Sequence, residues 1–250
     1  MDKELSLLKE IIRKSRNTVF FGGAGVSTES GIPDFRSEAG LYAAESVYGY
    51  PPEELLSHHL FEQEPALFFR YYKENLVTPY AKPNAAHLAL AELEARGLLK
   101  AVITQNIDGL HQEAGSQNVL ELHGSNKRQY CMGCGARYEM EYILTPAHCR
   151  GDGVPVCEKC KGIVRPDVVL YEEGLCDKTT AAALRAISSA EVLLVCGTSL
   201  VVYPAAGMLR YFCGSHLVLI NKSKTAYDAS AQLVIHHAIG EVLGQVVHGL

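Results

Sequence analysis

The sequence predicts an α/β fold, built on a parallel sheet and joined to a smaller part that is rich in turns and cysteines. Five apolar runs have the length and composition of buried strands, at 18–21, 101–104, 119–122, 192–196 and 217–220. Each run is followed by glycine or polar residues at its carboxyl end, as at the ligand-binding edge of an open parallel sheet. Between 123 and 166 short turns, glycines and cysteines replace the apolar runs, which indicates an inserted module.

Composition describes an ordinary globular chain. Its 250 residues are 48% hydrophobic and 20% charged, enough apolar mass for one large domain or for a large and a small one. The net charge of −5 argues against nucleic acid as a main partner. Residues 1–4 show no secretory signal, and the charge-free run 192–209 contains Gly197 and Pro204, so we expect strand, loop and helix there rather than a membrane span. We therefore expect a cytoplasmic protein without a membrane partner, and a monomer.

The chain begins with an amphipathic helix over 2–15, which leads into the first strand. The stretch that follows the strand, residues 22–36, reads GGAGVSTESGIPDFR. Its glycines permit a tight turn and close approach to a ligand, although the dinucleotide fingerprint is only half met. Ser27, Thr28 and Ser30 stand where a phosphate-binding helix would begin. The sequence 31–33 should break that helix, which leaves Asp34, Phe35 and Arg36 on a loop at the mouth of the site.

Residues 41–83 are rich in aromatics and prolines, and they predict a helical excursion from the sheet that covers a cleft. We interpret its aromatic residues as core rather than as a binding face. Asn84 then caps a helix that runs to about Arg96 and ends at Gly97.

Two CxxC pairs predict a metal site. They are Cys131 with Cys134 and Cys157 with Cys160, and four thiolates from two tight turns suit one tetrahedral ion. Because four protein ligands leave no position for substrate, we expect one structural zinc. Iron in a rubredoxin-like centre is the alternative.

The remaining four of the eight cysteines have no CxxC partner. Cys149 lies between the two pairs and could compete as a ligand. We expect Cys176, Cys196 and Cys213 to be core thiols. In the absence of an export signal, this pattern favours a metal and free thiols over a disulfide framework.

Three polar residues that follow strands are candidates for chemistry. His123 comes after the third run beside a glycine, and a near-neutral pKa suits an imidazole to removing a proton from a hydroxyl. Asn106 offers uncharged donor and acceptor groups, and Asp108 can accept a hydrogen bond from a carboxamide. No GxSxG elbow is present, so a serine nucleophile has no support.

The chain resembles the sirtuins. The segments that carry the resemblance, in order along the chain, are GAGVSTESGIPDFR (23–36), KPNAAH (82–87), TQNIDGLH (104–111), ELHG (121–124), the two CxxC pairs, GTSLVVYPAA (197–206) and IN (220–221). The resemblance implies a Rossmann-like NAD-binding domain formed by 1–40, 84–126 and 166–250. It also implies a smaller domain made of a helical module at 41–83 and a zinc-binding module at 127–165.

The same resemblance implies NAD-dependent removal of acyl groups from protein lysines, with His123 as general base and Asn106 as a second catalytic residue. The products would be free lysine, nicotinamide and an acylated ADP-ribose. The residues implied to contact NAD, in addition to His123, are Ala24, Thr28, Phe35, Arg36, Gln105, Asn106, Ile107, Asp108, Thr198, Ser199, Asn221, Lys222, Ala238 and Ile239.

Acetylated proteins are the implied partners. The substrate would lie as an extended strand between 168–171 and 200–203, in contact with Val168, Tyr171, Leu200 and Val201. Where sirtuins usually have Phe-Gly-Glu, this chain reads Tyr171-Glu172-Glu173. Members that favour acidic acyl groups carry a Tyr-x-x-Arg, and its counterpart here is Phe69-x-x-Tyr72. Without that fixed cation we expect neutral acyl groups, chiefly acetyl.

Three other readings remain open. A mono-ADP-ribosyltransferase would label protein from NAD without needing acyl-lysine. A module that binds NAD or ADP-ribose without chemistry would be insensitive to His123→Ala. A hydride-transferring dehydrogenase would change NADH absorbance, and the broken helix at 31–33 argues against it.

Overall fold

The computed structural model describes residues 2–34 and 45–250, and it contains two sheets. The helices of the described chain are α1 (Asp2–Lys14), α2 (Glu45–Tyr48), α3 (Pro52–Leu55), α4 (His58–Gln63), α5 (Pro65–Asn75), α6 (Ala85–Ala95), α7 (Leu110–Glu113), α8 (Met140–Leu144), α9 (Asp177–Ser189) and α10 (Ile239–His248). The strands are β1 (Thr18–Gly22), β2 (Leu99–Thr104), β3 (Val119–Glu121), β4 (Gly124–Cys131), β5 (Arg137–Glu139), β6 (Val164–Val168), β7 (Val192–Cys196), β8 (His216–Ile220) and β9 (Leu233–Ile235).

The larger sheet is parallel, in the order β3-β2-β1-β7-β8-β9. All residues of β1 and of β7 are buried, because helices cover both faces of the sheet. Successive side chains of β1 enter opposite cores. Phe20 joins the core formed with α1, α6 and α10, whereas Phe21 joins the core formed with α9 and the 3₁₀ segment Ala205–Tyr211. The predicted Rossmann-like architecture is thereby confirmed.

The five predicted strands are all present, with small shifts of their ends. The second begins at Leu99 rather than at 101, and the third ends at Glu121. The remaining strand of the larger sheet, β9, is not predicted from the sequence, because its three residues at the sheet edge make too short an apolar run. The charge-free run forms β7, a loop and a 3₁₀ helix. Among the described residues no helix is both long and apolar enough to cross a bilayer.

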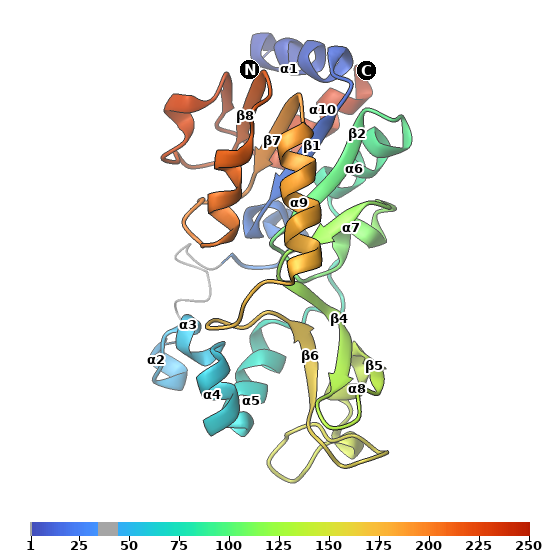
Figure 1. The fold of residues 1–250 in the computed structure, drawn as a ribbon, viewed down its shortest axis with the longest axis vertical. Coiled ribbons are helices and arrows are strands. Elements are labelled where there is room, and N and C mark those ends of the chain that lie inside the picture. The colour runs from blue at the N-terminus through green and yellow to red at the C-terminus, as the bar shows by residue number, and fades with distance from the viewer. Residues whose placement is uncertain (1, 35–44) are drawn as a thin grey trace.

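The smaller part combines helices α2–α5 with an antiparallel sheet of order β5-β4-β6 (Figure 1). Its core contains Phe61, Phe68, Phe69 and Tyr72, as predicted for the aromatic residues of the excursion, whereas Tyr80 is 92% exposed. The implied domain boundaries at 126/127 and 165/166 fall inside β4 and β6. These two strands run continuously from beside the larger sheet into the smaller part (Figure 1).

Candidate functional site

The glycine-rich turn after β1 packs directly against the turn after β7. The Gly25 amide donates to the Gly197 carbonyl at 2.8 Å, and a Cβ on Gly25 would lie 2.7 Å from the Gly197 Cα. Two short 3₁₀ turns, Ala24–Val26 and Thr28–Ser30, replace a full helix, and Gly31 ends the second with φ of +80°. The prediction of a helix broken at this point is confirmed.

The side chain of Ser27 is buried at the junction of the two 3₁₀ turns. Its hydroxyl donates to Asp108 Oδ2 at 2.7 Å and accepts from Asn106 Nδ2 at 3.0 Å. The other carboxylate oxygen of Asp108 accepts from the Leu110 amide at 2.9 Å. Ser27 therefore fixes the orientation of two residues that sequence analysis assigned to the ribose and nicotinamide.

Two further residues, His87 and Asn84, extend this network, and sequence analysis assigned neither of them to the site. His87 Nε2 lies 3.5 Å from the Ser27 hydroxyl, and its Nδ1 accepts from the Asn84 amide at 3.2 Å. The Asn84 side chain in turn donates to the Val26 carbonyl at 2.8 Å and to the Ser30 hydroxyl at 3.0 Å. Burial lowers the pKa of His87, while the Asp108 carboxylate opposes this shift. The KPNAAH segment (82–87), quoted for the resemblance, contains both residues.

The turns after β2, β7 and β8 are also joined by hydrogen bonds. Gln105 Nε2 donates to Thr198 Oγ1 at 3.2 Å. The Thr198 amide donates to Asn221 Oδ1 at 3.1 Å. Because the strands are parallel, their carboxyl ends form one edge, and uncharged donors and acceptors from three turns meet there.

His123 lies between the end of β3 and the start of β4. Its Nδ1 is 2.9 Å from the carbonyl of Gln105, and a carbonyl can only accept, so Nδ1 carries the proton. Nε2 of the neutral ring is then left with its lone pair. Burial lowers the pKa of His123, and the hydrogen bond to Gln105 only partly offsets this. A neutral imidazole with a fixed tautomer is the form that a general base requires.

The other implied cofactor contacts lie on the same edge, with two exceptions outside the described residues. Phe35 and Arg36 fall in the segment 35–44, which the structure does not describe. Ser199 and Lys222 are exposed beyond β7 and β8. Ala238 precedes α10 and Ile239 begins it, and the Ile239 side chain is buried in the core beside the sheet.

The residues implied to hold the peptide lie on two segments. Val168 ends β6 and Leu200 has a positive φ of 58°, and both are buried. The side chains of Tyr171 and Val201 are 37% and 49% exposed. The main chain of Tyr171 already has partners, since its amide donates to Leu56 and its carbonyl accepts from His58, each at 3.0 Å.

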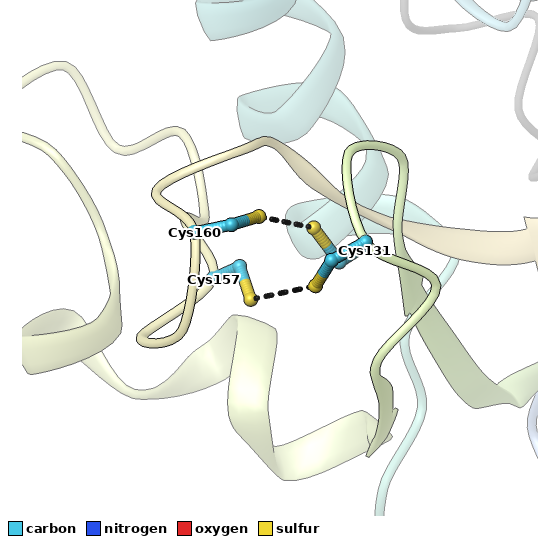
Figure 2. Close-up of side chains that lie close together, drawn as sticks. Cys131, Cys157 and Cys160 are labelled. Carbon is cyan, nitrogen blue, oxygen red and sulfur yellow. Dashed lines mark hydrogen bonds between the residues drawn. The ribbon is translucent and has the colours of Figure 1, made fainter.

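The four CxxC cysteines converge as predicted. Their sulfur atoms all lie within 4.8 Å of one another. Cys131 Sγ is 3.3 Å from Cys160 Sγ, and Cys134 Sγ is 3.7 Å from Cys157 Sγ (Figure 2). The Tyr138 hydroxyl lies 3.0 Å from Cys157 Sγ. Four thiolates this close, from two tight turns, fit one tetrahedral zinc ion with no open position.

The other cysteines lie outside this cluster. Cys149 is half-buried, and its thiol lies 3.4 Å from Lys73 Nζ. Cys196 is a core thiol as expected, but that prediction is wrong for Cys176 and Cys213, which are exposed. Cys176 precedes α9 and Cys213 lies in the turn before β8, so neither is on the buried face of an element.

These observations define a class of protein: a dinucleotide-binding fold of the Rossmann type with a helical excursion and a four-cysteine metal module. The Sir2 family model matches residues 23–204. The chain belongs to the Sir2 family.

Its relatives match over almost their full length. A protein of Clostridium acetobutylicum named NAD-dependent protein deacetylase is 56% identical over 247 residues, which cover 99% of each chain. A protein of the same name from Clostridium perfringens is 57% identical and is covered completely, by 99% of this chain. Among solved structures, a Sir2 variant with a deacetylated p53 peptide and 3′-O-acetyl ADP-ribose gives a TM-score of 0.90 at 37% identity, covering 98% of both chains.

Proposed function

We propose that this chain is an NAD-dependent protein lysine deacetylase. The observation that carries the proposal is the neutral, half-buried His123 on the sheet edge where the turns after β1, β2 and β7 meet. Full-length relatives that are named NAD-dependent protein deacetylases support it. The products are then the free lysine, nicotinamide and O-acetyl-ADP-ribose.

In this proposal NAD lies along the carboxyl edge of the larger sheet and supplies a ribose carbon that becomes electrophilic as nicotinamide departs. Asn106 and Asp108, oriented by Ser27, hold the ribose and nicotinamide end. Thr198 and Asn221 hold the adenosine half, together with Ala24 and Thr28 of the first loop. His123 Nε2 takes a proton from a ribose hydroxyl, while the buried surroundings keep out the water that would otherwise hydrolyse NAD.

An acetyl group suits the small part better than an acidic acyl group. Phe69 and Tyr72 are each only 1% exposed and lie within its apolar core. The buried guanidinium of Arg165 is committed to Glu173, with contacts of 2.7 and 3.1 Å. An acyl carboxylate would therefore compete for a cation that is already neutralised. We infer that acetylated proteins are the substrates of a monomeric, cytoplasmic enzyme.

Mass spectrometry of an acetyl-lysine peptide incubated with NAD tests the proposal. The intact protein is expected to form free peptide, nicotinamide and O-acetyl-ADP-ribose. His123→Ala should reduce the rate by about 10²–10⁴-fold, the usual contribution of a general base, and should still bind NAD.

The competing activities give different products in the same experiment. ADP-ribose attached to protein, without a requirement for acyl-lysine, would indicate a transferase. An unchanged peptide with NAD bound would indicate a binding module. Faster removal of succinyl than of acetyl would overturn the inferred acyl preference.

A further inference from the structure

The segment that follows β6 is fastened to the start of helix α4. The Tyr171 amide donates to the Leu56 carbonyl and the His58 amide donates to the Tyr171 carbonyl, which forms a parallel bridge between Ser57 and Tyr171. Leu170 is held as well, because its amide donates to Glu173 Oε2 at 2.8 Å and its carbonyl accepts from the Glu173 amide at 3.1 Å. These main-chain groups are therefore already paired before any peptide binds.

Glu173 is the centre of the buried side of this connection. Its carboxylate accepts from both terminal nitrogens of Arg165 and lies 2.9 Å from His58 Nδ1. Arg165 also donates to the Val168 carbonyl at 2.9 Å. The hydrogen bonds from Arg165, Leu170 and His58 hold the pKa of Glu173 well below its usual range, at about 2, against the opposing effect of burial. One ionised carboxylate thus joins β6, the turn and α4.

Glu172 makes the exposed side of the connection, and it does so at a conformational cost. Its φ is +75°, a left-handed conformation that favours glycine. Its Oε2 accepts the His59 amide at 2.9 Å, an N–H group in the first turn of α4 that has no partner within the helix. A glycine at this position would avoid the strain but could not make this bond.

We propose that Glu172 and Glu173 are positioning residues for the substrate peptide, which lock segment 168–171 onto helix α4. The inference rests on the proposed function, in which this segment borders the acetylated peptide. It makes the helical module, which is distant from His123 in the sequence, a determinant of peptide affinity. The main-chain groups of Leu170 and Tyr171 are already hydrogen-bonded within the protein. An incoming peptide would therefore contact this segment through the Tyr171 side chain.

Steady-state kinetics with an acetyl-lysine peptide tests this role in the full-length protein. Glu172→Ala should raise the KM for the peptide about fivefold, the effect of losing one helix-capping bond, and leave the KM for NAD unchanged. Glu172→Gln keeps an oxygen acceptor and should restore most of the peptide affinity. Glu54→Ala removes an exposed carboxylate of the same module and serves as the matched control.

Hydrogen exchange gives a second readout that does not require activity. Glu172→Ala should speed amide exchange in 56–60 and 168–173, and Glu54→Ala should not. Unchanged exchange in Glu172→Ala, or a KM for the peptide within twofold of the parent's, would reject this positioning role. If exchange changes as expected in the two variants but the parent protein leaves acetyl peptides intact, the deacetylase function is rejected instead.

Discussion

Burial lowers the pKa of three histidines in this chain, His87, His111 and His123, and His111 is the clearest case. Its side chain is 1% exposed, and neither ring nitrogen has a hydrogen-bond partner among the residues that the structure describes. Its ring packs edge-on against His87 and Phe20. Burial lowers the pKa of His111 to about 3, and the neighbouring His87 adds to the shift.

This burial predicts a loss of stability in mild acid. The unfolded chain takes up a proton at His111 below its ordinary pKa near 6.5, whereas the folded chain does not, so stability falls as the pH decreases from 6.5 toward 3. Between pH 7.5 and 5.5 this one histidine should lower the free energy of unfolding by about 1 kcal/mol. Urea unfolding at the two pH values measures it.

His111→Phe keeps an aromatic ring and removes both unpaired nitrogens, so the free energy of unfolding of this variant should fall by about 1 kcal/mol less than that of the parent between those pH values. His248→Ala, at an exposed position, is the control and should keep the parent's pH dependence. An equal pH dependence in His111→Phe and in the parent would show that His111 is protonated in the folded state.

Sequence patterns identified the polar residues at the sheet edge but not the buried serine that joins two of them. His123, Asn106 and Asp108 follow strands, and a position at the carboxyl end of a parallel strand can be read from the chain. The hydrogen bond from Ser27 to Asp108 joins residues 81 positions apart, and Ser27 and His87 are 60 apart. No local pattern encodes contacts of that separation, so Ser27 was assigned to phosphate on its local position alone.

At the scale of elements, the turns after β1 and β7 are in direct contact at the sheet edge where NAD is proposed to bind. Gly197 has φ of +61°, and a Cβ there would lie 2.4 Å from the Val26 amide nitrogen. Because the atoms that this Cβ would meet belong to the main chain, it could be accommodated only if one of the two turns moved. The contact between the two turns is therefore made by main chain at Gly25, Val26 and Gly197.

Gly197→Ala should accordingly destabilise the protein by more than about 2 kcal/mol, from the clash and the left-handed backbone together, and raise the KM for NAD. Thermal or urea unfolding and initial rates measure the two effects. Gly244→Ala lies within α10, where a Cβ meets nothing within 4 Å, and should instead stabilise the protein by about 0.5–1 kcal/mol. A Gly197→Ala protein as stable as its parent would mean that the turns do not touch.

Strand prediction succeeded where a strand is a continuous apolar run and failed where polar residues or proline interrupt it. β1 and β7 are apolar throughout because both faces of the sheet are covered. β4 carries the polar sequence GSNKRQYC with a break in register between Ser125 and Gln129, and β6 contains Arg165 and Pro166. Neither strand has an apolar alternation to detect, so the small sheet was visible only as a change of pattern.

At the scale of the whole molecule, strand β4 connects the metal module to His123, the proposed general base. β4 begins one residue after His123 and ends at Cys131. The core of the smaller part includes Cys131 and Cys157 beside the aromatic residues of α5. Four thiolates without an ion would repel one another when ionised, so the module depends on its metal.

Removal of zinc by a chelator should therefore unfold the smaller part first. Hydrogen exchange is expected to rise in β4, β5 and β6 while β1, β7 and β8 stay protected, and deacetylation should stop. Cys131→Ala should bind no zinc, whereas Cys149→Ser should retain one ion per chain, as measured by metal analysis. Simultaneous loss of protection in both sheets would contradict this order.

Both excursions from the larger sheet are closed at their roots. The chain leaves for the helical excursion near Ser30 and returns at Asn84. The Asn84 side chain donates to the Val26 carbonyl and the Ser30 hydroxyl, which joins the two ends of the excursion. The Val169 amide donates to the His123 carbonyl at 2.9 Å and closes the root of the metal module in the same way. Evolution can therefore lengthen, shorten or exchange either insert without rethreading the sheet, and substrate range can diversify while the chemistry stays fixed.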